Sequence, residues 1–491
     1  MAEAVRGLWL RRPDLSARGP APRWLLPLGL ILAAGVAFGL VIDAAVTTAA
    51  IGLVLLPPFA GATVLRIVAF VEVLRRPSIA AAAVPAPACP AMALPRYSIL
   101  VPLYDEAAVL GRLVAGLAQL DYPADRLDIL IILEERDAAT RLAAADLVLP
   151  RHMRIVVVPP GGPQTKPKAL NYALSFASGD LLVVFDAEDR PERDQLRIAA
   201  ATFRRAGPAL ACLQARLNIY NPDESFFTRQ FALEYSALFD GLLPALDRLD
   251  LPMPLGGTSN HFRMAALRAA GAWDPYNVTE DADLGIRLAR MGYQTATIAS
   301  TTWEEAPESG RIWLGQRTRW LKGWVQTWLV HMREPGSLLA RLGFWRFMGL
   351  QLIMGGVLLS ALVHPVFVVL VLWGLWTGDL VLVTGSAVGS WIWWLAIANL
   401  ATGMAAPMLT AAAAVVRRGR AGLLPFVVLM PVYWLMISVA GYRALIELGL
   451  RPFHWEKTRH GITRRGARRR RITRRQLTAT AKRPHSLAPK G

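Results

Sequence analysis

Long runs of residues without a charged side chain are the feature that most limits how this chain can fold. No Asp, Glu, Lys or Arg occurs in five stretches, Trp24–Ile42, Ala44–Leu65, Phe347–Gly378, Leu380–Val416 and Ala421–Tyr442. A helix needs about 20 apolar residues to cross the hydrocarbon core of a bilayer. The runs therefore predict membrane-spanning or membrane-embedded helices at both ends of the chain.

Basic residues predict which ends of these runs face the cytosol. Five Arg precede the first run, and Arg75 and Arg76 follow the second. Because Lys and Arg accumulate on the cytoplasmic side of membrane proteins, we expect a helical hairpin with both flanks inside and Asp43 at its outer turn. The expected location is the bacterial inner membrane, crossed several times, with the soluble part of the chain in the cytosol.

The last apolar stretch, residues 423–442, contains Pro425 and Pro431 and leads into a strongly basic segment. Residues 451–491 carry 14 Lys and Arg against one acid, and so hold +13 of the net charge of +18. A single crossing would place this segment outside, so we expect 423–442 to be re-entrant or interfacial. Since the basic segment lacks interleaved aromatic residues, we expect it to meet anionic lipid, and we expect no nucleic-acid partner.

These patterns divide the chain into six segments. The first three are a basic cytosolic N-terminus (1–23), two transmembrane helices (24–76) and a Pro/Ala-rich linker (77–95). The other three are a soluble domain with an interfacial helix at its end (96–335), transmembrane or re-entrant helices (336–450) and an Arg-rich cytosolic tail (451–491).

Within the soluble domain, short apolar runs alternate with helical patterns. The predicted strands are Tyr97–Leu103, Leu127–Leu133, Ile155–Val158 and Leu181–Phe185, and the predicted helices between them include Glu106–Leu120 and Pro167–Ala177. Such alternation indicates an α/β fold with a parallel sheet, in which functional residues collect at the carboxyl ends of the strands.

Acidic residues follow two of these strands. Glu134 and Glu135 end the second strand, and Asp186, Glu188 and Asp189 follow the fourth. Hard divalent cations take carboxylate oxygens and leave positions open for substrate phosphates. The pattern predicts a Mg²⁺ or Mn²⁺ site at Asp186 and Glu188 that would neutralise a diphosphate leaving group, with added charge from the nearby Lys166.

Two further motifs lie later in the domain. An amphipathic helix is predicted to begin at Thr279, Glu280 and Asp281. In a structural role, Thr279 would cap this helix and the helix dipole would stabilise the two acids. In a chemical role, Asp281 would be a general base. Residues 316–320 read Gln-Arg-Thr-Arg-Trp within a Trp-rich stretch just before an apolar run. Guanidinium groups suit phosphate and indole faces suit sugar rings.

Taken together, these motifs resemble the membrane-integrated family 2 glycosyltransferases, which include the cellulose, hyaluronan and chitin synthases. The resemblance runs in order from about Tyr97 to His331. It departs in the first acidic pair, which is Glu-Glu rather than Asp-Asp, and in the metal motif, where either Glu188 or Asp189 would meet the ion. Four motifs carry it: Glu134-Glu135, Asp186-Ala-Glu188, Thr279-Glu-Asp281 and Gln316-Arg-Thr-Arg-Trp320.

The resemblance implies a cytosolic α/β domain of the Rossmann-like GT-A fold inserted between N- and C-terminal transmembrane helices. It also implies site residues in four groups. The nucleotide-sugar group is Tyr104, Glu106, Glu134, Glu135, Lys166, Asp186, Gln316, Arg317, Arg319 and Trp320. The acceptor group is Thr258, Ser259, Asn260 and Trp320; the catalytic group is Asp281 and Glu280; the metal group is Asp186, Glu188 and Asp189.

The implied reaction is inverting transfer of a hexose from a UDP-sugar, with UDP-glucose or UDP-N-acetylglucosamine as the expected donor. The Gln-Arg-x-Arg-Trp motif favours a growing polysaccharide as acceptor, with export components among the expected partners. The alternative is a single transfer to a membrane lipid, which the small number of apolar runs favours, because few helices are available to form a channel.

Overall fold

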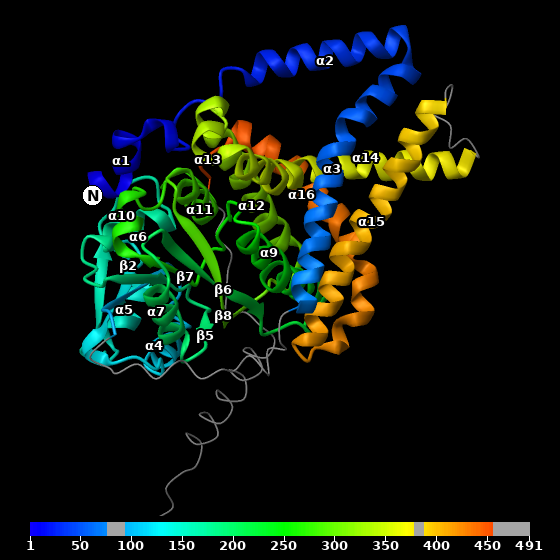
Figure 1. The fold of residues 1–491 in the computed structure, drawn as a ribbon. Coiled ribbons are helices and arrows are strands. Elements are labelled where there is room, and N and C mark those ends of the chain that lie inside the picture. Colours follow the sequence, from blue (N-terminus) through cyan, green and yellow to red (C-terminus); the bar gives the residue numbers. More distant parts are fainter. Residues whose placement is uncertain (76–93, 378–386, 455–491) are drawn as a thin grey trace, which may run out of the picture.

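The computed structural model describes residues 1–75, 94–377 and 387–454 of the 491-residue chain. Most of the linker expected at 77–95 and of the tail expected at 451–491 lies outside these residues. The described chain forms an α/β domain with long apolar helices on one side (Figure 1).

The domain is built on an eight-stranded sheet with the order β3-β2-β1-β4-β7-β6-β8-β5. β1 to β4 are parallel, as are β6 and β8, whereas β7 runs antiparallel to both of its neighbours and β5 antiparallel to β8. The expectation of a parallel sheet therefore holds for one half only. The strands are β1 (Tyr97–Leu103), β2 (Leu127–Glu134), β3 (Met153–Val158), β4 (Leu181–Val184), β5 (Arg190–Pro191), β6 (Leu210–Ile219), β7 (Asn260–Arg263) and β8 (Gln294–Glu304).

Helices cover both faces of the sheet, which is why β1, β4 and β6 are almost entirely buried. α4 and α7 enclose one core and α6, α10 and α11 the other. The helix expected at 106–120 is shorter, because residues 104–109 form a loop at the end of β1. The helices are α4 (Leu110–Leu117), α5 (Ala138–Ala145), α6 (Lys166–Leu174), α7 (Gln195–Arg205), α8 (Phe226–Ala237), η4 (Leu238–Leu242), α9 (Leu243–Arg248), α10 (Met264–Ala269), α11 (Glu280–Arg290) and α12 (Gly310–His331), with the short turn η3 (Ala124–Arg126).

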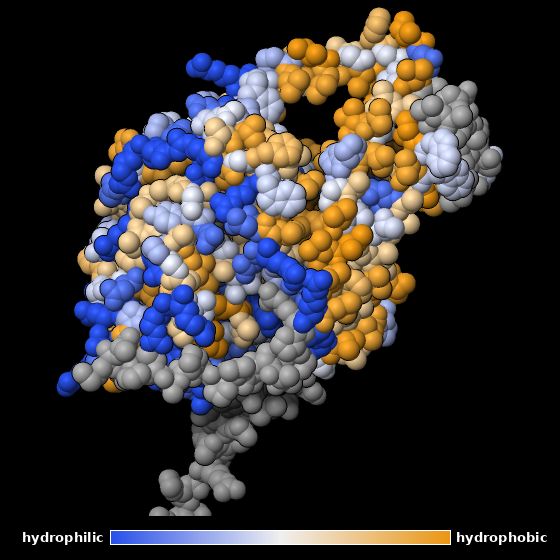
Figure 2. Space-filling model, in the orientation of Figure 1, coloured by the Kyte–Doolittle hydropathy of each residue, from blue (hydrophilic) through white to orange (hydrophobic). Residues whose placement is uncertain are grey.

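Five helical segments in the described ranges are long and apolar enough to cross a membrane. α3 packs along α15, whereas no residue of α2 is buried, and Figure 1 shows α2 diverging from α3. Apolar residues gather over these helices in Figure 2, while the domain surface is mixed. The elements are α2 (Leu25–Ile42), α3 (Ala44–Arg75), α13 (Pro335–Leu350), η5 (Gln351–Gly355), α14 (Gly356–Thr377), α15 (Ala387–Arg417), η6 (Ala421–Leu429) and α16 (Met430–Leu450).

The segment η6–α16 contacts the α/β domain at both of its ends. Just before η6, the Arg418 guanidinium forms an ion pair with Asp240. At the other end, Lys322 on α12 bonds to Glu447 (3.3 Å) and to the Arg451 carbonyl oxygen (3.3 Å). A helix that crossed a bilayer would carry one end away from the domain. These contacts therefore favour an interfacial or re-entrant segment, although its length and composition would allow a crossing.

The N-terminal residues are part of the domain surface. α1 (Ala2–Arg11) packs against α6, where the Asn171 side-chain amide donates to the Ala4 carbonyl oxygen (3.1 Å). After the short helix η1 (Pro13–Leu15), the Arg333 guanidinium donates to four carbonyl oxygens between Pro13 and Pro20. The basic N-terminus expected as a separate segment is thus folded onto the α/β domain.

Candidate active site

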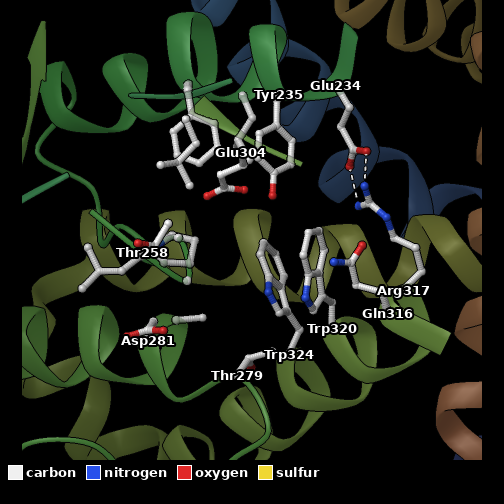
Figure 3. Close-up of a pocket in the computed structure, with 18 of the residues that line it drawn as sticks. Glu234, Tyr235, Thr258, Thr279, Asp281, Glu304, Gln316, Arg317, Trp320 and Trp324 are labelled. Atoms are coloured by element: carbon white, nitrogen blue, oxygen red, sulfur yellow. Dashed lines mark hydrogen bonds and ion pairs between the residues drawn. The ribbon is translucent and has the colours of Figure 1, made fainter. Parts of the chain in front are cut away.

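A cavity of about 720 Å³ joins the carboxyl ends of the strands to the apolar helices. Its walls come from the loops after β1 and β4, from α8, α11 and α12, and from α3, η5, α14, α15 and α16. Figure 3 shows its central part, with two indoles of α12 facing a carboxylate and a tyrosine hydroxyl across the space. The cavity brings together most of the residues that the motifs predict.

The turn after β4 presents carboxylates in two directions. Asp186 and Glu188 line the cavity. Asp189 turns away from it, since its Oδ2 accepts from the backbone N–H of Asp186 (2.7 Å) and from the Thr258 hydroxyl. The geometry therefore favours Glu188 over Asp189 as the carboxylate that faces a donor, with Asp189 shaping the turn.

These carboxylates fit a divalent cation. Burial, together with the charge of Asp186, raises the pKa of Glu188 and Asp189 well above the ordinary range. The surroundings therefore disfavour the negative charge, and a bound cation would offset that charge. The buried Oδ1 of Asp189 accepts no hydrogen bond within the described chain. No cluster of three acidic, His or Cys side chains that could hold a metal occurs in the described ranges. A Mg²⁺-type ion does not need one, because it combines one or two carboxylates with water and substrate phosphates.

Lys166 supplies the positive charge nearest to this turn. Its Nζ lies 2.7 Å from Asp186 Oδ1 and donates to the Gly257 carbonyl oxygen (2.6 Å). Burial opposes its charge, but Asp186, Asp281 and Glu280 outweigh burial and raise its pKa above the ordinary value. Lys166 is therefore charged and can bind a diphosphate.

Three of the expected nucleotide-contacting residues lie at or just after the ends of β1 and β2 and line the same cavity. They are Tyr104, Glu106 and Glu134, and Glu134 is held by an ion pair with the buried Lys168 (2.9 Å). Glu135 is exposed and does not line the cavity. Of the two adjacent acids in this motif, the fold brings only Glu134 to the site.

Asp281 lies in the first turn of α11 with one oxygen fixed. Its Oδ1 accepts from the indole N–H of Trp273 (2.9 Å), and Asp281 and Glu280 both line the cavity. Burial and the charge of Glu280 raise the pKa of Asp281 well above the ordinary range. Such a shift increases the basicity of a carboxylate, which suits a general base.

The start of α11 is held by packing rather than by the expected cap. Thr279 occupies the N-cap position, but its hydroxyl bonds to the Asn277 side chain and makes no capping bond. The capping role predicted for Thr279 is therefore wrong. α12 approaches so closely that a Cβ atom at Gly323 would lie 2.3 Å from the Thr279 hydroxyl oxygen, so glycine is required there.

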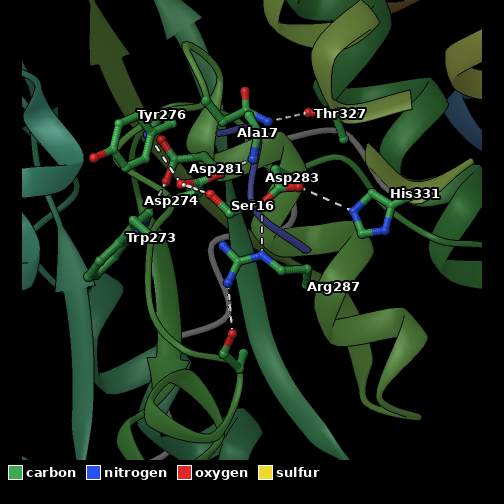
Figure 4. A network of polar contacts seen from close by, with 12 residues as sticks. Ser16, Ala17, Trp273, Asp274, Tyr276, Asp281, Asp283, Arg287, Thr327 and His331 are labelled. Atoms are coloured by element: carbon green, nitrogen blue, oxygen red, sulfur yellow. Dashed lines mark hydrogen bonds and ion pairs between the residues drawn. The ribbon is translucent and has the colours of Figure 1, made fainter. Parts of the chain in front are cut away.

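A buried polar network fixes α11 from behind (Figure 4). Asp283 accepts from Arg287 (2.7 Å) and bonds to His331 of α12 (3.2 Å). Asp274, in the loop before α11, accepts from the Ser16 hydroxyl (3.1 Å) and the Ala17 N–H (2.6 Å). The N-terminal segment and α12 thus both hold the element that carries Asp281.

α12 places its motif residues at different depths. Trp320 and Trp324 face the cavity side by side in Figure 3. Arg317 pairs with Glu234, and its guanidinium carbon lies 4.6 Å from the Trp320 ring centroid, so it supports that indole. Gln316 and Arg319 also line the cavity, and Arg319 donates to the Val278 carbonyl oxygen (3.3 Å).

The segment expected to contact the acceptor is divided between cavity and core. Thr258 lines the cavity. Ser259 is fully buried and donates to the Thr302 hydroxyl (2.7 Å), and the Asn260 amide donates to the Gly256 carbonyl oxygen. The fold therefore brings Thr258, but not Ser259 or Asn260, to the cavity wall.

Two cavity residues were not anticipated. Glu304, at the end of β8, and the Tyr235 hydroxyl of α8 both point into the space in Figure 3, and the charge of Glu304 acts on that hydroxyl. Burial and the charges of Asp189, Glu188 and Asp186 raise the pKa of Glu304 well above the ordinary range. The only sequence signal was an acidic pair, Glu304-Glu305, at the end of a strand.

Comparison with known proteins identifies a family over the α/β domain. Residues 95–323 match the family described as "Glycosyltransferase like family 2". The beta-monoglucosyldiacylglycerol synthase of Synechocystis is 29% identical over 266 residues, 52% of this chain and 54% of that protein. The UDP-forming cellulose synthase 1 catalytic subunit of Komagataeibacter xylinus is 28% identical over 251 residues, 50% of this chain and 32% of that protein.

Among solved structures, a mannosyltransferase from Pyrobaculum calidifontis in complex with GDP-Man and Mn²⁺ superposes with a TM-score of 0.47 and 20% identity, over 81% of this chain and 98% of that one. The chain spans about half or less of the length of the curated relatives described above. It contains apolar helices of membrane-spanning length on both sides of the matched residues. By this family match, residues 95–323 of the chain form a family 2 glycosyltransferase domain.

Proposed function

We propose that this glycosyltransferase moves a single hexose from a UDP-sugar to a hydroxyl group of a membrane lipid, at the cytosolic face of the bacterial inner membrane. The observation that carries this proposal is the continuity of the cavity. The same space that contains Asp186 and Asp281 extends to apolar residues of η5, α14 and α15, namely Leu352, Ile353, Val357 and Pro407. Such walls suit acyl chains.

Donor binding would use the polar end of the cavity. Tyr104, Glu106 and Glu134 surround the expected nucleotide position, and Lys166 stands beside the carboxylates that would meet the diphosphate. Asp186 and Glu188 would hold Mg²⁺ or Mn²⁺, which would neutralise negative charge on the leaving diphosphate. Lys166 would add a second positive charge at the same place.

The transfer itself requires a base on the face opposite the leaving group. Asp281 would take the proton of the acceptor hydroxyl while its oxygen attacks the anomeric carbon. A new carbon–oxygen bond forms at the anomeric carbon while the bond from that carbon to the diphosphate oxygen breaks. UDP leaves, and the configuration at the anomeric carbon is inverted. The Trp273 bond would keep Asp281 oriented.

A second candidate is extension of a polysaccharide. Trp320 and Trp324 present two neighbouring indoles to the cavity, and aromatic faces pack against sugar rings. The relatives with similar domains include both a lipid glucosyltransferase and a cellulose synthase by their names. A glycan end lying on these indoles would reach Asp281 equally well.

Product analysis separates the two candidates. The purified full chain in nanodiscs is incubated with a panel of labelled UDP-sugars, and the products are partitioned between organic and aqueous phases and sized. We expect a labelled lipid bearing one sugar. Long water-soluble or insoluble chains would refute lipid transfer and support the polysaccharide candidate.

Orientation is tested separately. Reporter fusions at residue 335 and after Gly491 should both be active in the cytosol, since η6–α16 contacts the domain at both ends. A reporter after Gly491 that is active only in the periplasm would refute the interfacial assignment.

A further inference from the structure

Arg66 is a cation on the cavity wall within a helix that otherwise has the composition of a membrane span. It follows the uncharged run Ala44–Leu65, and Leu65 and Ala69 line the cavity beside it. Its Nη1 donates to the Gly403 carbonyl oxygen of α15 (3.2 Å). Among the residues that the structure describes, no carboxylate forms an ion pair with Arg66.

Arg66 lies at the end of the apolar run nearest the catalytic domain. At 1.5 Å per residue the run Ala44–Leu65 is about 33 Å long, close to the hydrocarbon thickness of about 30 Å. One turn further on, the domain already meets the helices, because a Cβ atom at Gly241 would lie 3.1 Å from the Ala69 carbonyl oxygen. The guanidinium is therefore near the level at which lipid headgroups begin.

A positive charge in a cavity with apolar walls is stable only when an anion or a set of acceptors compensates it. One carbonyl oxygen satisfies a single N–H of a guanidinium that has five. Arg is also the side chain best shaped to bind two oxygens of one phosphate. The site therefore has the chemistry of a phosphate-binding position at headgroup level.

We propose that Arg66 binds the phosphate of an anionic lipid acceptor whose headgroup carries the reacting hydroxyl. This inference rests on the proposed function, in which a membrane lipid is the acceptor, and names the class of lipid. Apolar residues such as Leu352 and Ile353 would contact the acyl chains, while the headgroup hydroxyl extends toward Asp281.

The two ends of the cavity would orient such a lipid by charge. Lys166, beside Asp186, would be occupied by the donor diphosphate, and the carboxylates of Glu280 and Glu304 would repel a second phosphate, whereas Arg66 would attract it. A neutral lipid such as diacylglycerol would leave Arg66 without a counter-ion. The enzyme should therefore prefer a hydroxylated phospholipid to a neutral lipid of equal chain length.

The test compares Arg66→Gln with Arg75→Gln in the full chain. Arg75 is an exposed cation at the end of the same helix and is not part of the cavity wall, so it controls for charge on α3. Nanodiscs of phosphatidylcholine contain either phosphatidylglycerol or diacylglycerol at equal mole fraction. The apparent KM for the lipid is measured in transfer assays, and retained phosphatidylglycerol is measured by native mass spectrometry.

We expect Arg66→Gln, but not Arg75→Gln, to raise the KM for phosphatidylglycerol about 10- to 100-fold, as expected for loss of a charge-assisted hydrogen bond, and to lose retained lipid. Unchanged KM and retention in Arg66→Gln would overturn the inference. Displacement of the lipid by excess inorganic phosphate would also overturn it, because the site would then bind a free anion.

The binding measurement separates this inference from the proposed function. If the unmodified chain retains phosphatidylglycerol through Arg66 but forms only polysaccharide, the lipid site stands and lipid transfer is wrong. If a labelled neutral lipid is the product and Arg66→Gln has no effect, lipid transfer stands and the assignment of Arg66 is wrong.

Discussion

Replacing Asp281 by Asn tests the proposed base most directly. The Asn side chain has the same shape and can still accept the Trp273 indole N–H, which bonds to Oδ1 at 2.9 Å. It cannot take a proton from an acceptor hydroxyl at neutral pH. The substitution therefore removes the proton transfer and leaves the surrounding contacts in place.

The expected loss of turnover is about 10²- to 10⁴-fold, the contribution of a general base, which corresponds to about 2.7–5.5 kcal/mol of activation free energy. Folding should not suffer. Burial and the charge of Glu280 raise the pKa of Asp281, which means that the surroundings disfavour the carboxylate. An uncharged amide avoids this cost, so we expect an equal or higher Tm.

The assay measures transfer, UDP affinity and thermal unfolding on the same preparation. Because the pKa of Asp281 is raised, the wild-type rate should fall as the pH is lowered through that pKa, and Asp281→Asn should lose this acid limb. Glu280→Gln, which changes the neighbouring cavity carboxylate, is the matched control and should retain the acid limb. Near-normal turnover of Asp281→Asn would refute the base assignment and leave Asp281 a helix-start acid.

Three further predictions concern the metal, the α12 contacts and a buried histidine. Chelation should abolish transfer and Mg²⁺ or Mn²⁺ should restore it; full activity in chelator would remove the metal from the mechanism. Arg317→Ala should lower the free energy of unfolding by about 3 kcal/mol, because Glu234 loses its buried partner, and the double variant with Glu234→Gln should recover most of it in chemical denaturation. Burial lowers the pKa of His261 to about 3, so the unfolded chain binds its proton first, and stability should fall by up to about 1.4 kcal/mol per pH unit below pH 6.5. His261→Gln should flatten that dependence in thermal unfolding curves, and an unchanged slope would contradict it.

Local pattern was enough to predict the first four strands and the positions of most candidate site motifs. β1 begins and ends where the apolar run Tyr97–Leu103 does, and β2 differs by one residue, because burial of both faces leaves a continuous apolar stretch in the sequence. The acids after β4 and at the start of α11 were also anticipated, since strand ends and helix starts are local features. Their meeting in one cavity follows from the α/β topology.

Other features depended on residues far apart in the sequence. The Thr258 hydroxyl donates to Asp189, and Glu188 is the carboxylate that faces the cavity. The spacing of residues in the sequence does not tell which of these two acids faces the cavity. Arg317 pairs with Glu234, and Tyr235 meets Glu304, through contacts across about 70 to 80 residues that packing alone creates.

The sequence by itself determined that the chain combines apolar helices with an α/β glycosyltransferase domain, because hydrophobic period and motif order are properties of local stretches. Only the tertiary structure decided that β7 runs antiparallel, that η6–α16 returns to the domain, and that Arg66 joins the wall of the candidate active-site cavity. These outcomes depend on which surfaces meet when distant segments pack, and that information is not contained in any single segment.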